Sequence, residues 1–167
     1  MPCQITLVTF QRILQSLLSE SVTVKDLPSI LEAISEIANS TTNVARMVEH
    51  IRTRLSKQMC HGFLNDEGFI PIVILSSHWE KIFMENLFGE DDNKNLAMQQ
   101  SKLREFVENV NIKLDKLAAS RITPMLLTSP ILRPFVRSVT ERFKPNLIIL
   151  SQNEIHTKIK IKTYGEI

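Results

Sequence analysis

Residues 125–150 read MLLTSPILRPFVRSVTERFKPNLIIL, and the hydrophobic pattern changes twice within them. The short apolar runs at 125–128 and 147–150 are typical of buried strands. Between the two runs, apolar residues recur at helical spacing: Leu132, Phe135, Val136, Val139 and Phe143. A strand, a helix and a returning strand in this order predict a right-handed crossover in which the two strands are parallel.

The helix of this crossover contains a proline close to its start. Pro134 lacks the N–H that the helix would use just after its first turn, so we expect the helix to begin as a tight turn or a kink. The apolar stripe places Val136 and Val139 on the buried side. Arg133 and Arg137 fall outside the stripe, and we therefore expect both to be exposed.

Strand and helix patterns continue on both sides of the crossover. Residues 69–75 are apolar on both faces, as in a strand that is covered from two sides. Pro71 cannot donate to a hydrogen-bond ladder, which predicts an edge position for this strand. Helical spacing predicts helices over about 77–87 and 96–119. The strict alternation at 158–162 predicts a C-terminal strand with one wet face.

Three helical patterns occupy the first sixty residues. They cover about 6–19, 27–38 and 44–55, and Asp26 is a suitable N-cap for the second. Short polar links separate the three. The sequence therefore predicts an α+β fold with two parts. A helical subdomain of three short helices at 1–62 is followed by a small α/β subdomain at 63–167, which contains the crossover and the C-terminal strand.

The composition excludes several classes of protein. A chain of 167 residues with 43% hydrophobic and 23% charged residues suits one globular domain. Its longest apolar run, 69–75, is far shorter than the ~20 residues of a membrane helix. Residues 1–4 lack the basic flank of a signal peptide, so we expect a cytoplasmic location.

No catalytic or ligand-binding motif is evident. The four glycines are too scattered for a nucleotide-binding loop, and Cys3 and Cys60 form neither a zinc motif nor a dithiol motif. No Ser or Cys lies in a nucleophile motif with one of the four histidines. We therefore expect no enzyme activity, no cofactor and no metal ion.

Charge is distributed unevenly along the chain. Residues 63–96 carry two basic and seven acidic side chains, whereas residues 97–167 carry twelve basic and six acidic ones. The basic residues are spread over two helices and a strand without interleaved aromatic residues. A solvated surface is therefore a better interpretation than a nucleic-acid site.

Four arginines are candidates for contact with a partner or a neighbouring subunit. Arg133 and Arg137 are four residues apart on one helix face, where like charges repel unless an anionic group pairs with them. Glu141 could neutralise Arg137 within the helix. Arg52 and Arg54 lie about 160° apart around a helix end, so at most one can face the core. A purely structural role remains the alternative for all four.

Three blocks of the sequence resemble one protein family. FQRILQSLLSESVTVKDL at 10–27, followed by ILEA at 30–33, is similar to a signature of the FHIPEP family. This family comprises flagellar and type III secretion export-gate proteins. EHIRTRLSKQM at 49–59 and the region 124–155 are similar to further blocks in its cytoplasmic part, in the order of the family.

The resemblance implies a non-enzymatic docking and assembly module for protein export. Its implied partners are other export-apparatus proteins, export chaperones and cargo, bound mainly through upstream subdomains. Family members have a long N-terminal membrane domain, which implies a location at the cytoplasmic face of the bacterial inner membrane. The resemblance also implies a ring of identical subunits in the full-length parent.

Three residues differ from the usual family residues, namely Lys25, Ser56 and Lys57. The two lysines keep the positive charge and Ser56 loosens a turn, so the resemblance still holds.

A helix-turn-helix nucleic-acid-binding protein is the alternative. The helices at 27–38 and 44–55 would form the motif, beside a basic C-terminal sheet. Glu49 lies among the arginines of the second of these helices, and a phosphate-binding face would be less mixed in charge. The sequence therefore favours the export-gate interpretation.

Overall fold

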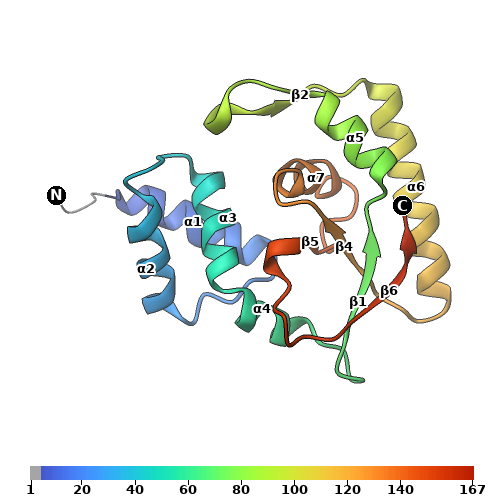
Figure 1. Ribbon diagram of the computed structural model, residues 1–167, viewed down its shortest axis with the longest axis horizontal. Coiled ribbons are helices and arrows are strands. Elements are labelled where there is room, and N and C mark those ends of the chain that lie inside the picture. The colour runs from blue at the N-terminus through green and yellow to red at the C-terminus, as the bar shows by residue number, and fades with distance from the viewer. Residues whose placement is uncertain (1–4) are drawn as a thin grey trace.

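The computed structural model describes residues 5–167, so Cys3 and the signal-peptide interpretation of residues 1–4 lie outside the described residues. A small sheet is placed between two groups of helices. In Figure 1, α1 to α3 lie on the left, α4 lies near the middle at the bottom, and α5 and α6 lie on the right. The elements are, in chain order, α1 (Leu7–Ser19), α2 (Leu27–Ile37), α3 (Val44–Arg54), α4 (Ser56–Phe63), β1 (Ile70–Ile74), α5 (Ser77–Glu85), β2 (Leu87–Phe88), the 3₁₀ helix η1 (Asp91–Asn93), β3 (Asn95–Leu96), α6 (Gln100–Ala119), β4 (Met125–Thr128), α7 (Arg133–Thr140), β5 (Ile149–Ser151), the 3₁₀ helix η2 (Gln152–Glu154) and β6 (Ile161–Glu166).

The predicted α+β class is confirmed, with one more N-terminal helix than expected. Helix α4 has few apolar residues and no side-chain cap, so its sequence gave no clear helical stripe. Its Met59 and Cys60 are nevertheless buried against the other helices, and packing therefore stabilises it. None of the helices in residues 5–167 combines the length and the apolar character needed to cross a bilayer.

The main sheet has four strands in the order β5-β4-β1-β6, and all its neighbours are parallel. The parallel pairing predicted for the crossover is confirmed, because β4 and β5 are parallel with Leu126 opposite Ile149. The predicted edge position of the strand at 69–75 is wrong, since β1 lies between β4 and β6. Pro71 is tolerated there because the pairing of β1 with β4 begins only at Ile72.

Alternate residues of the strands face two separate hydrophobic cores. Ile70 and Ile72 of β1 pack with α1 to α4, whereas Val73 packs with α5, α6 and α7. On β4, Leu127 belongs to the first core and Leu126 to the second. The second core also contains Trp79, Phe83, Phe106, Val110, Leu132 and Val136.

The boundary at 62/63 between a helical and an α/β subdomain remains a proposal. Helix α4 runs to Phe63, and the first core contains side chains from both sides of the boundary. We therefore expect the two parts to unfold together, since they share buried apolar surface.

The start of α7 agrees with the sequence prediction, and the bounds of the C-terminal strand differ from it. Residues 130–132 form a turn and α7 begins at Arg133, so Pro134 occupies the first turn, where a missing N–H costs little. This agrees with the expected tight turn. The C-terminal strand is Ile161–Glu166 rather than 158–162, because pairing with β1 starts where Ile161 lies opposite Ile70.

A first prediction concerns the second core. Phe106 is fully buried and packs edge-to-face against Trp79 and Phe83, with ring centroids 5.1 Å apart in both pairs. Phe106→Ala should lower the free energy of unfolding by about 3–5 kcal/mol in a urea titration, because it opens a cavity. Ile112→Ala on the exposed side of the same helix is the control and should change it by less than about 0.5 kcal/mol. Similar losses for the two variants would contradict the assigned face of α6.

Candidate functional site

A cluster of charged side chains lies between the N-terminal helices and the sheet. Arg52, Arg133 and Glu154 are each at most 1% exposed, which is rare for charged residues. We call the cluster the junction network. It contains three arginines and three glutamates: Glu20, Glu49, Arg52, Arg133, Arg137 and Glu154.

Glu20 is positioned by the way in which α1 ends. Ser21 adopts a left-handed conformation with φ of 60°, and Ser21 and Val22 both donate their N–H groups to carbonyls of the last turn of α1. Val22 then returns to the core. This closing turn follows the Schellman pattern, and it leaves Glu20 at the helix end within reach of the junction network.

Arg133 contacts two carboxylates and the end of a strand. Its Nε donates to Glu49 Oε2 at 2.7 Å, and its Nη2 donates to the other oxygen of Glu49. Its Nη1 donates to Glu20 Oε2 at 2.6 Å and to the carbonyl of Ile149 at 3.1 Å. The planar guanidinium fork, with its five donors, suits this arrangement better than a lysine would.

Arg52 makes a fork-to-fork pair with Glu154. The Nε to Oε1 distance is 2.5 Å and the Nη2 to Oε2 distance is 3.2 Å. Arg52 also donates to Glu20 and to the carbonyl of Ile149, both at 3.2 Å. Glu154 in turn accepts the N–H of Ser151 at 2.9 Å in a capping box that begins η2. The Glu154 carboxylate is therefore held both by Arg52 and by the main-chain N–H of Ser151, the residue before η2.

Arg137 joins α7 to main-chain carbonyls. Its Nη1 donates to Pro145 and Leu147, both at 3.1 Å, and its Nη2 donates to Ser19 at 3.2 Å. The expected partner Glu141 lies 3.9 Å from Nε, and its carboxylate is largely exposed. Arg137 thus connects the end of α1 with the segment that leads into β5.

Burial and pairing act in opposite directions on these carboxyl groups. Burial alone would raise the pKa of Glu20, but hydrogen bonds and positive charge from Arg133, together with the charge of Arg52, lower it below the usual value. For Glu49, burial raises the pKa more than Arg133 lowers it. Burial disfavours the charged form of Arg133, yet Glu49 and Glu20 raise its pKa overall, so it remains charged.

The predicted exposure of Arg133 and Arg137 is wrong. Arg133 is 1% exposed and Arg137 is 9% exposed, although Val136 on the same helix is buried as predicted. Val139 is only partly buried. A helical stripe treats charged side chains as solvent-facing, and here carboxylates and carbonyls from distant segments compensate their charge.

Arg52 and Arg54 do point to different environments, as their spacing predicted. Arg52 is fully buried, whereas the side chain of Arg54 is 53% exposed and pairs with Glu36 at 2.7 Å. The partner contact proposed for the four arginines remains a prediction. Burial gives Arg52, Arg133 and Arg137 internal partners instead, so Arg54 is the one candidate whose side chain is largely exposed.

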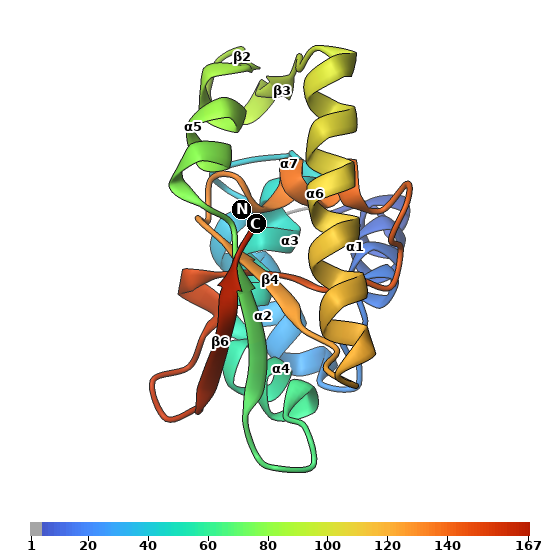
Figure 2. The ribbon, with the colours of Figure 1, turned by 90° about the vertical axis from the view of Figure 1, so that its right-hand side faces the viewer.

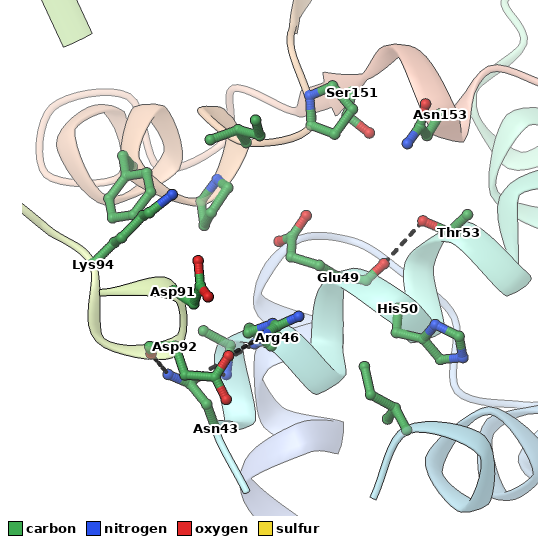
Figure 3. Close-up of a pocket in the computed structure, with 16 residues that line it drawn as sticks. Asn43, Arg46, Glu49, His50, Thr53, Asp91, Asp92, Lys94, Ser151 and Asn153 are labelled. Atoms are coloured by element: carbon green, nitrogen blue, oxygen red, sulfur yellow. Dashed lines mark hydrogen bonds and ion pairs between the residues drawn. The ribbon is translucent and has the colours of Figure 1, made fainter. Parts of the chain in front are cut away.

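An open cleft with a volume of about 670 Å³ lies beside the junction network. We call it the junction cleft. In Figure 3, Glu49 and Thr53 on α3 face Ser151 and Asn153 across it. The segment before and at the start of α7 forms an apolar wall, which consists of Pro130, Ile131, Pro134 and Phe135.

Asp92 fastens the segment 87–96 to the N-terminal helices at the rim of the junction cleft. We call this segment the β2–β3 arm; Figure 2 shows it at the end of the molecule where α5 and α6 meet. The Asp92 carboxylate pairs with Arg46 and accepts a hydrogen bond from Thr41 Oγ1 at 2.7 Å. The Asp92 carbonyl accepts a hydrogen bond from the side chain of Asn43. The acidic segment is thus bound to the start of α3.

Neither metal binding nor thiol chemistry has a ready site among the described residues. Within residues 5–167, no group of three or more His, Cys, Asp or Glu side chains is placed to hold a metal ion. Cys60 is buried and donates its thiol to the Glu154 carbonyl at 3.0 Å. Burial raises the pKa of this thiol, which disfavours the reactive thiolate.

The family model with the description FHIPEP family matches residues 1–160. This chain belongs to the FHIPEP family. Flagellar biosynthesis protein FlhA of Caulobacter vibrioides is 44% identical over 164 residues, which are 98% of this chain and 23% of that protein. Invasion protein InvA of Salmonella typhimurium is 30% identical over 150 residues, which are 90% of this chain and 22% of that protein. The chain thus spans less than a quarter of the length of each of these curated relatives.

Two solved structures have the same fold. The C-terminal domain of InvA superposes with a TM-score of 0.89 at 28% identity and covers 98% of this chain, which corresponds to 50% of that structure. Nonameric EPEC SctV-C has a TM-score of 0.84 at 19% identity, with 98% of this chain and 49% of that one covered, and shows the fold alone. The family resemblance read from the sequence is confirmed.

Sequence reasoning did not find the glutamates of the junction network. Ser151 and Glu154 have the spacing of a capping box, and this signal could have placed Glu154 at the start of a helical turn. Glu20 and Glu49 carry no such signal. Their partner Arg133 lies 113 and 84 residues away, so only the folded chain brings them together.

The junction network predicts that replacing a buried arginine lowers the free energy of unfolding far more than replacing an exposed one. Arg133→Met should lower the free energy of unfolding by about 3–5 kcal/mol, because it leaves Glu20 and Glu49 buried without their main partner. Arg54→Met removes a surface pair with Glu36 and should cost under about 1 kcal/mol. Urea titrations of both variants measure this difference, and equally small losses would show that the network is not essential to stability.

The pKa of Glu20 predicts a dependence of stability on pH. Its folded-state pKa lies below the usual 4.5, so the ionised carboxylate stabilises the fold above pH 4.5. As the pH falls below that value, the unfolded chain takes up the proton first and this stabilisation is lost. Urea titrations between about pH 3 and 6 should therefore show a shallower acid decline for Glu20→Gln than for the wild type. Glu49 has a raised pKa and should act with the opposite sign, mainly above pH 4.5. If Glu20→Gln declines in acid as steeply as the wild type, the lowered pKa of Glu20 in the folded state is contradicted.

Proposed function

We propose that this chain is the cytoplasmic docking portion of a bacterial flagellar or type III protein export gate. One observation carries the proposal, namely the FHIPEP match over residues 1–160. The likeness to the C-terminal domain of InvA supports it further. The relatives are named for flagellar biosynthesis and for invasion, and we infer that export of proteins is the activity the two kinds of system share.

A docking role without catalysis fits the chemistry of the described residues. Most of the charged side chains that lie inside the fold are paired with one another, as in a scaffold. We propose that the chain works at the cytoplasmic face of the inner membrane as part of a longer parent protein. Its partners would be other export-apparatus proteins, export chaperones and cargo.

Assembly into a ring is part of the proposal. The fold is also found in a solved structure described as nonameric SctV-C, so it is compatible with ring assembly. Of the four candidate arginines, Arg54 is the best placed for a subunit contact, because its exposed side chain is held by a surface pair that a neighbour can replace.

The nucleic-acid-binding alternative gains no support. Arg52 lies inside the junction network, and Arg46 and Arg54 on the same helix pair with Asp92 and Glu36. These pairs leave α3 without the uncompensated positive face that phosphate binding needs.

A chimera tests the proposed function. This chain replaces the matching 164 residues of Caulobacter vibrioides FlhA in a strain without its own copy of that protein. Swimming and secretion of flagellar proteins should be retained, at an abundance of chimera equal to that of wild-type FlhA. The Arg133→Met chimera is the control for loss of the fold, and it should be less abundant and export less. A chimera of normal abundance that exports nothing would refute the proposal, as would salt-dependent DNA binding by the chain alone.

A further inference from the structure

The β2–β3 arm has an apolar base and a polar tip. At the base, Leu87 lies opposite Leu96 in the antiparallel pair, and both side chains pack against the second core. At the tip, residues 88–95 include no buried side chain, and all of them are exposed except Asp92, which is half-buried. The hydrophobic effect therefore holds only the base of the arm, and the tip depends on another attachment.

Asp92 supplies that attachment through polar contacts with the start of α3. Its carboxylate pairs with Arg46 and accepts a hydrogen bond from the Thr41 hydroxyl, and its carbonyl accepts one from the Asn43 side chain. Figure 3 shows Asp92 beside Asn43 and Arg46, whereas the neighbouring Asp91 points into the junction cleft. Within the described part of the chain, the hydrogen bonds and ion pairs that join the tip to the N-terminal helices are those of Asp92.

The start of α3 does not need the arm for its own structure. The side-chain oxygen of Asn43 accepts the N–H groups of Ala45 and Arg46, and this oxygen caps the helix. The side-chain nitrogen of Asn43, which donates to Asp92, takes no part in the cap. The Thr41 hydroxyl also accepts the N–H of Asn43 at 3.0 Å. Loss of the contact with Asp92 would therefore leave the first turn of α3 capped.

The turn of the arm is held by its own contacts in the same way. The Asn93 N–H donates to the Glu90 carbonyl at 2.7 Å, and at the base the Ala97 N–H donates to the Asn86 carbonyl at 2.9 Å. Gly89 has a φ of 100°, and a Cβ there would lie 2.5 Å from the Asn93 carbonyl oxygen. Only glycine permits so tight a turn. The arm is therefore a preformed unit that can move about its base.

The contact between these two units is the weaker of the two polar connections across the molecule. The side chains of Arg46 and Asp92 are 50% and 35% exposed, and ion pairs of this kind contribute little and are screened by salt. In the junction network, by contrast, Arg52 and Arg133 are fully or almost fully buried with their carboxylate partners. Water can take the place of α3 around the Asp92 carboxylate, but it cannot reach the buried arginines as easily.

We propose that the β2–β3 arm is a salt-sensitive strap. In the closed state Asp92 holds the tip of the arm on the start of α3. In the open state the tip moves away about Leu87 and Leu96, while both cores and the junction network stay intact. Asp91, Asp92 and Lys94 line the junction cleft, so opening of the strap removes one side of that cleft. Both states are formed by this chain alone and do not depend on the proposed export function.

Double electron–electron resonance between two spin labels measures the opening. The labels are attached at Glu32→Cys on α2 and at Glu90→Cys at the tip of the arm, both of which are exposed positions, in a chain that also carries Cys3→Ser. Cys60 is buried and burial raises the pKa of its thiol, so it should remain unlabelled. Asp92→Ala should raise the ratio of long to short distances at least about tenfold, because it removes an ion pair and a hydrogen bond. Salt at about 1 M should raise the same ratio in the labelled wild type.

Asp91→Ala is the matched control. It removes the same charge from the same turn without removing a contact with α3, and it should keep the distances of the labelled wild type. Both variants should also keep the urea midpoint, since neither carboxylate belongs to a core. Unchanged distances in Asp92→Ala would overturn the strap. A urea midpoint of Asp92→Ala as low as that of Phe106→Ala would also overturn it, because the arm would then open only with the whole fold.

A double variant tests the contact from the side of α3. Arg46→Met should also raise the ratio of long to short distances, because it removes the cation that pairs with Asp92. If both residues act through this one pair, Arg46→Met should add nothing in a chain that already carries Asp92→Ala. Effects of the two substitutions that multiply would show that they act independently and would overturn the assigned contact.

Discussion

The ion pairs of Arg133 and Arg52 are the constraint on which the arrangement of the two halves depends. These arginines bring together the end of α1, the middle of α3, the start of α7 and the turn after β5. The hydrophobic effect has no direction, whereas a buried guanidinium tolerates few positions, because each of its donors must meet an acceptor. Both arginines donate to the carbonyl of Ile149, so the network also fixes the end of the sheet.

The sheet explains why such a network is needed. Its strands are short, and their alternate residues supply two cores on opposite faces. The helices on one side therefore contact those on the other mainly through the sheet. The junction network adds a polar connection at β5, where Arg52 and Arg133 both donate to the carbonyl of Ile149, and Asp92 adds a second polar fastening at the rim of the junction cleft. Between these two fastenings the junction cleft stays open.

This arrangement connects the stability of the fold with the walls of the junction cleft. Glu49 belongs to the buried network and also faces the cleft, with 24% of its side chain exposed. Its partner Arg133 lies at the start of α7, which carries part of the apolar wall of the cleft. The walls of the cleft are thus built on the same contacts that hold the fold together.

The sequence by itself determined the α+β class, the crossover from β4 to β5 and most helices, because apolar periodicity is local information. The blocks at 10–27 and 124–155 also sufficed for the family. Tertiary structure alone decided the central position of β1, the formation of α4 and the burial of Arg133 and Arg137. Each of these depends on segments that lie far away in the chain. The position of β1 depends on the pairing with β4, which begins only after Pro71. Helix α4 depends on the core around Met59, and the buried arginine Arg133 depends on the carboxylates of Glu20 and Glu49. A pattern read along one helix can show that an arginine leaves the apolar stripe, but whether that side chain meets water or a buried carboxylate is settled only when distant segments pack together.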